Sequence, residues 1–78
     1  MALDIITHMG KLYRVTAEWD SESGVWVAES DDVPGLIAEA ASPNLLREKL
    51  RLLIPELLEL NGVLDKDQGV VHFEVGYR

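Results

Sequence analysis

The chain has 78 residues, no cysteine, and a net charge of −7 from 14 acidic and 7 basic residues. This length fits one small domain, and the acidic balance argues against direct nucleic-acid binding, because phosphate backbones attract basic surfaces. Without cysteine there is no disulfide framework and no thiolate metal site, and no stretch is apolar enough for a membrane span or a signal peptide, so we expect a cytoplasmic protein.

Residues 1–10 show no clear periodicity, and we expect an N-terminal tail in front of a single domain over residues 11–78. The two histidines, His8 and His72, are far apart in the sequence. Because a zinc site needs three or four ligands, neither histidine indicates a metal, and no cofactor is expected.

Residues 11–19 alternate between apolar and polar side chains, which predicts a β-strand. The segment from Asp20 to Gly24 predicts a hairpin turn, and residues 25–30 predict a second strand. The acidic turn DDVPG over residues 31–35 places a glycine where positive φ is needed, and residues 36–40 predict a short third strand at a sheet edge.

The second predicted strand is apolar on both faces, with Val25 and Val27 on one side and Trp26 and Ala28 on the other. A strand of this kind is buried on both sides. The sequence predicts only one helix, which can cover one face of the sheet. We therefore expect a homo-oligomer, a dimer or tetramer, with Trp26 and Ala28 in its interface. The alternative is that Trp26 packs against a loop or the tail of its own chain.

Four acidic residues lie around the DDVPG turn: Glu29, Asp31, Asp32 and Glu39. A basic protein partner is favoured by the net charge, chiefly through a faster encounter, and these four residues are its candidate contacts. The alternative is that they are only the solvated charges of a turn and an edge strand. A two-metal nuclease needs several converging carboxylates, whereas Asp31 and Asp32 adjoin each other in a turn and should diverge.

Residues 42–62 predict the helix around which the chain is organised. Ser42 is a suitable N-cap, Pro43 suits the first helical position, and Gly62 can end the helix in a left-handed conformation. Pro55 lies inside the helix, and we expect a kink or a break next to it, at Ile54.

The helix carries an apolar stripe at helical spacing that should face the sheet. Its members are Leu46, Leu50, Leu53, Leu57 and Leu60, with Ile54 at the border. Leu45 and Leu52 lie off this stripe. They form either a second contact surface or ordinary exposed leucines.

Residues 70–77 predict the last strand, and the segment DKDQG before it, with Asp65 and Asp67, lacks the spacing and closing glutamate of an EF-hand calcium loop. The expected fold class is therefore α+β, in the order β-β-β-α-β. Short turns make the first three strands an antiparallel meander, and the helix returns the last strand parallel to one of them. We predict a mixed sheet of order 3-2-1-4 with the helix on one face.

The strand-turn-strand VWVAESDDVPGL over residues 25–36, followed by a leucine-rich helix, resembles the HicB-like antitoxin superfamily, and within it a small single-domain family of unassigned function. The resemblance covers residues 13–62. It implies a partial ribonuclease-H-like or double-stranded-RNA-binding-like fold without the nuclease active site. It also implies a small basic messenger-RNA-cleaving HicA toxin as partner and a dimeric or tetrameric assembly. Because the sequence ends at Arg78, just after the last predicted strand, we do not expect the C-terminal DNA-binding segment that such antitoxins usually carry, nor operator binding by this chain.

The sequence therefore favours a non-catalytic protein-interaction module, a HicB-like antitoxin or an orphan relative that binds a small basic toxin. The alternative is an uncharacterised homo-oligomeric protein with metal-dependent nuclease or RNA-binding activity. We expect no catalytic residues, because no motif for catalysis stands out.

Overall fold

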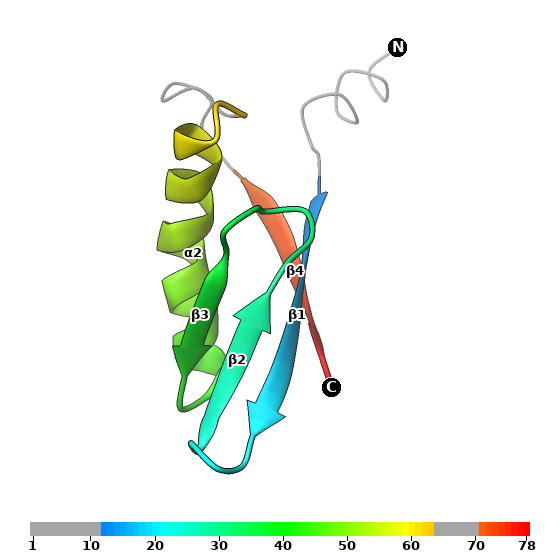
Figure 1. The fold of residues 1–78 in the computed structure, drawn as a ribbon, viewed down its shortest axis with the longest axis vertical. Helices are drawn as coiled ribbons and strands as arrows, with labels where there is room; N and C mark the ends of the chain where they lie inside the picture. The colour runs from blue at the N-terminus through cyan, green and yellow to red at the C-terminus, as the bar shows by residue number, and fades with distance from the viewer. Residues whose placement is uncertain (1–11, 64–70) are drawn as a thin grey trace.

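Four strands and one helix follow one another in the predicted order across residues 12–63 and 71–78, which are the residues that the computed structural model describes (Figure 1). The elements are β1 (Leu12–Asp20), β2 (Val25–Glu29), β3 (Ile37–Ala40), α2 (Pro43–Leu60) and β4 (His72–Tyr77). The predicted tail over residues 1–10, with His8, and the predicted connection with Asp65 and Asp67 lie outside the described residues.

The strands form one mixed sheet of order β3-β2-β1-β4, which confirms the predicted α+β class and topology. β1 pairs antiparallel with β2, and β2 with β3, as short turns require. β4 returns parallel to β1 after the helix. Gly35 and Gly62 take the positive φ predicted for them, 84° and 73°.

α2 lies over β3 and β2 on one face of the sheet (Figure 1). Ser42 caps it as predicted, because its Oγ accepts the N–H of Leu45 at 3.2 Å. The helix does not break at Pro55 but runs unbroken for 18 residues. Ile54 and Leu58, on either side of the proline, are fully buried, and this packing offsets the lost hydrogen bond. Within the described ranges, no helix is both long and apolar enough to cross a membrane.

The buried stripe of α2 differs from the predicted one. The inner stripe, the residues that are fully buried against the sheet, consists of Leu46, Leu50, Ile54 and Leu58. Leu53 and Leu57 are only partly buried, and Leu60 is 75% exposed. Residues four apart form rows that are inclined to the helix axis, and such an inclined row follows a twisted sheet better than a stripe parallel to the axis.

Alanines form the floor beneath the helix. Ala17, Ala28 and Ala38 lie side by side on three neighbouring strands, all of them buried. Because these side chains are small, the long side chains of the inner stripe can fill the space above them at interior packing density. The register therefore places the core between α2 and this face of the sheet.

Candidate functional site

The second face of the sheet is covered by no other element among the described residues. Strand alternation gives this open face seven side chains near its middle: Thr16, Glu18, Val25, Val27, Glu29, Ile37 and Glu39. Three of them are valine or isoleucine, and Ile37 is 74% exposed. A hollow of about 410 Å³ lies over Thr16, Glu18, Val27 and Glu29. The open face therefore combines an apolar centre with carboxylates.

Val27 is flanked by two glutamates. Glu18 is its neighbour on β1, and Glu39 is its neighbour on β3. Glu29 lies further along β2 on the same face, between Thr16 and Ile37. Adjacent strands are about 4.8 Å apart, so the Cα atoms of Glu18 and Glu39 are roughly 10 Å apart. In the described part of the chain, none of these three carboxylates has an ion-pair partner.

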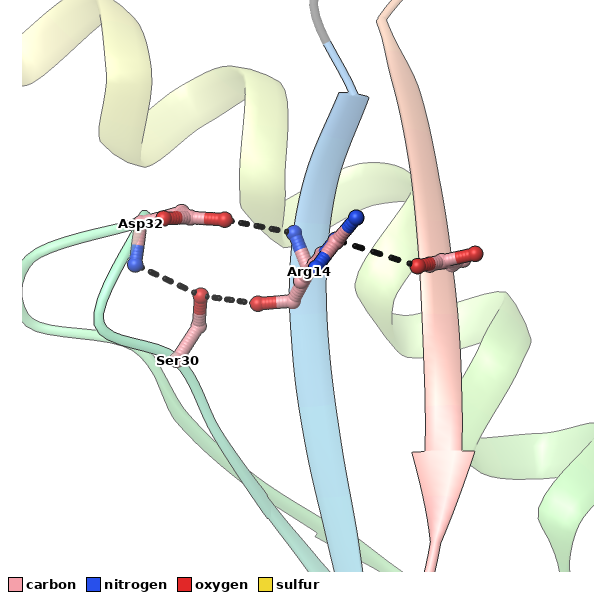
Figure 2. A network of polar contacts seen from close by, with 4 residues as sticks. Arg14, Ser30 and Asp32 are labelled. Atoms are coloured by element: carbon pink, nitrogen blue, oxygen red, sulfur yellow. Dashed lines mark hydrogen bonds and ion pairs between the residues drawn. The ribbon is translucent and has the colours of Figure 1, made fainter.

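The acidic turn after β2 is tied to β1 by side-chain hydrogen bonds (Figure 2). Asp32 Oδ2 accepts the backbone N–H of Arg14 at 2.8 Å, and the Ser30 hydroxyl donates to the Arg14 carbonyl at 2.5 Å. Ser30 Oγ also accepts the N–H of Asp32 at 3.0 Å. The pairing of β2 with β1 ends at Glu29, so these two side chains continue the ladder where the strand stops.

The four acidic residues proposed from the sequence therefore fall into two groups. Glu29 and Glu39 share the open face, whereas Asp31 and Asp32 lie in the turn beyond it. Asp32 holds the turn in place, and Asp31 is exposed. Glu18 joins the first group and was missed, although a hairpin register counted back from Gly24 would have set it opposite Val27.

The prediction that Trp26 and Ala28 line an uncovered face is wrong. Ala28 is fully buried under α2, and Trp26 packs on the same face against the core. The apolar side left open by the helix is that of Val25 and Val27. The alternation of β2 defined two faces but could not say which one the helix takes, because both are apolar.

Trp26 is the middle member of an aromatic cluster at the end of the sheet. Its ring centroid lies 5.6 Å from that of Trp19 and 5.3 Å from that of Tyr77, the latter in an edge-to-face arrangement. Trp19 and Tyr77 are each 46% exposed. The cluster joins β1, β2 and β4. Trp26 is therefore held by its own chain.

The nuclease alternative requires metal-ligating side chains that converge. Across residues 12–63 and 71–78, no group of three or more histidine, aspartate or glutamate side chains could hold a metal ion. Arg14, which strand alternation places on the open face with Thr16 and Glu18, pairs with Glu74 at 3.3 Å. Among the described residues, the basic side chains on this face are Arg14 and Arg78, and Arg78 lines a hollow with Thr16, Glu29 and Ile37. Two arginines do not make a stripe that could follow a phosphate backbone.

Comparison with known proteins gives a family and a fold but no activity. Residues 12–78 match the family described as a domain of unknown function (DUF1902). The crystal structure of hypothetical protein TTHA1013 from the extremely thermophilic bacterium Thermus thermophilus is similar, with a TM-score of 0.77 and 48% sequence identity. That match covers 87% of this chain and 93% of the Thermus chain. No curated protein matches the chain.

Proposed function

Because the chain belongs to the DUF1902 family of domains of unknown function, we propose its role from its own surface: it is a non-catalytic module that binds a small basic protein over the open face. The observation that carries this proposal is the set of carboxylates that have no ion-pair partner among the described residues, Glu18, Glu29 and Glu39, around the half-buried Val25 and Val27 and the exposed Ile37.

Electrostatics supports a basic partner rather than an acidic or neutral one. Glu18 and Glu39 repel each other across Val27, since their strands place them within about one Debye length at physiological salt. A lysine or arginine from a partner would relieve this repulsion, and the net charge of −7 would speed the encounter. Val25, Val27 and Ile37 would supply the apolar centre that stable interfaces bury.

The resemblance to HicB-like antitoxins supports the class of partner. The motif over residues 25–36 and the leucine-rich helix resemble antitoxins that neutralise small basic HicA toxins. We therefore propose a HicA-like toxin, or a basic protein descended from one, as the occupant of the open face. The protein is then an antitoxin or an orphan relative that retains the binding surface.

The test is a neutralisation assay with matched charge variants. Small basic proteins encoded beside this gene are expressed in a bacterial host, and those that arrest growth are co-expressed with the chain. We expect the chain to restore growth and Glu18→Gln/Glu29→Gln to fail. The control Glu48→Gln/Glu59→Gln changes the net charge equally on the exposed side of α2 and should restore growth.

Association rates measured with this chain and the purified basic protein give the size of the charge effect. We expect the open-face variant to slow association about ten-fold at low ionic strength, and high salt to reduce the difference. The proposal fails if no neighbouring basic protein is neutralised, or if the open-face and control variants bind such a protein equally well.

A further inference from the structure

α2 carries a second line of exposed side chains on the flank beside the β3 edge. This outer stripe consists of Leu45, Lys49, Leu52, Glu56 and Leu60, at the spacing of one helix face. Leu45, Leu52 and Leu60 are 55%, 78% and 75% exposed. Three large exposed leucines in one line mark a contact surface rather than scattered apolar residues. Figure 1 shows α2 running beside β3 at this edge of the sheet.

We propose that the outer stripe binds a second copy of this chain, with the two α2 helices antiparallel across a two-fold axis. The order of residues along the stripe carries the inference. Leu45 and Leu60 lie at mirror positions about the centre between Leu52 and Leu53, and so do Lys49 and Glu56. An antiparallel copy therefore sets leucine against leucine at both ends and Lys49 against Glu56 of the second copy, twice.

A parallel arrangement does not share this complementarity, because it sets Lys49 against Lys49 and Glu56 against Glu56. Within one chain the two charges do not satisfy each other either. They are seven residues apart, about 10.5 Å along the helix axis, and no ion pair involving either one is found in the described part of the chain. The charge pattern therefore selects both the partner and its orientation.

Lys49 is already ordered for this contact. Its Nζ donates to the Glu39 carbonyl oxygen at 2.6 Å, which holds the side chain against β3. An ammonium has three donors, so Lys49 can keep this bond and still meet a carboxylate. Because the side chain is already held, its ordering costs less on binding. The same bond occupies an acceptor on the edge strand, which favours contact through the helices over continuation of the sheet.

The surface around the stripe is hollowed on both sides of Lys49. One hollow, of about 480 Å³, is lined by Ala40, Ala41 and Leu45, and the other, of about 420 Å³, by Ile37, Leu53 and Glu56; Lys49 and Leu52 line both. An exposed leucine of the second copy can enter either hollow. With one cation and one anion, the stripe has no preference for a basic protein. Ile37 and Glu39 of the open face border the second hollow, whereas Glu18 and Glu29 line neither hollow, so substitutions at these two residues address the open face alone.

The experiment is sedimentation velocity on the full chain over a concentration series, with a charge exchange. We expect the native chain to dimerise, and Lys49→Glu or Glu56→Lys alone to weaken the dimer at least ten-fold by placing like charges together. The double variant Lys49→Glu/Glu56→Lys should restore the affinity to within about three-fold, because the pair is re-formed with its signs exchanged.

Two further variants keep the result unambiguous. Leu52→Gln should leave a folded monomer by circular dichroism, since Leu52 is 78% exposed and lies outside the core. Glu18→Gln/Glu29→Gln should dimerise like the native chain, which separates this proposal from the one on the open face. A native chain that remains monomeric at millimolar concentration overturns the proposal, and so does a double variant as weak as the single ones.

Discussion

Asp32 accepts the backbone N–H of Arg14 at 2.8 Å although the two residues are 18 positions apart in the chain. The bond closes the ladder of β1 beyond the end of β2, and Ser30 completes it on the Arg14 carbonyl. The DDVPG turn is thus tied to the sheet by side-chain hydrogen bonds, and its two aspartates have different roles.

We expect Asp32→Ala to lower the free energy of unfolding by about 1–2 kcal/mol, because it leaves the Arg14 N–H without its charged acceptor. Asp31→Ala should change it by less than about 0.5 kcal/mol, as expected for an exposed side chain. Urea denaturation of the two variants checks this. Equal effects would mean that the carboxylate bond contributes little.

The position of the inner stripe can be tested by truncation. Leu58→Ala should cost about 3 kcal/mol, because Leu58 is fully buried. Leu60→Ala should cost less than about 0.5 kcal/mol when it is measured at a concentration where the chain is monomeric. A larger loss of stability for Leu60→Ala than for Leu58→Ala would mean that the stripe predicted from the sequence is the buried one.

A substitution at Gly35 tests whether the acidic turn requires a positive φ at this position. Its φ of 84° is strained for any side chain, whereas an added Cβ would lie at an ordinary van der Waals distance, 3.9 Å, from Leu57 Cδ2. Gly35→Ala should therefore destabilise by about 1–2 kcal/mol. Gly76→Ala is the control, since nothing lies within 4 Å of its added Cβ, and thermal unfolding should show it neutral or slightly stabilising.

Trp26 distinguishes the two locations considered for self-association. Trp26→Phe keeps an aromatic ring on the core and should leave the dimer affinity unchanged, whereas Trp26→Ala should lower stability by about 3 kcal/mol. Sedimentation velocity on the folded variants is the measurement. If Trp26→Phe weakens the dimer as much as Lys49→Glu does, the interface lies at the aromatic cluster, as the sequence alone suggested.

The carboxylates of the open face should not contribute to stability. Glu39→Gln removes a like-charge repulsion, so we expect its melting temperature at low salt to rise by about 1–3 °C, with the gain lost at high salt. Glu48→Gln loses the ion pair with Arg51 instead and should show no gain. A marked fall for Glu39→Gln would assign that carboxylate a structural role.

Much of the fold could be predicted from local signals. The ends of the elements could be located from Ser42, which caps the helix, and from Gly35 and Gly62, which take positive φ. β1 could be located because its apolar side chains alternate with polar ones and lie on the buried face. Short turns then left few ways to order the strands, and the sheet order was predicted correctly.

What could not be predicted depended on register and on side-chain geometry across the chain. Because β2 is apolar on both sides, the sequence could not assign Trp26 and Ala28 to the helix face. Asp32 looked like a free surface charge, since its bond to Arg14 depends on where β2 ends. The second surface suggested by Leu45 and Leu52 could be assigned a proposed partner only once Lys49, Glu56 and Leu60 were placed along the same flank.

The chain contains two tryptophans, and the structure places both in one aromatic cluster, with ring centroids 5.6 Å apart. At that separation the two indoles exchange excitation energy, so tryptophan fluorescence reports on a single site between β1 and β2. Formation of the hairpin can thus be followed by tryptophan fluorescence in the unlabelled protein. The helix and the open face contain no tryptophan and contribute no such signal.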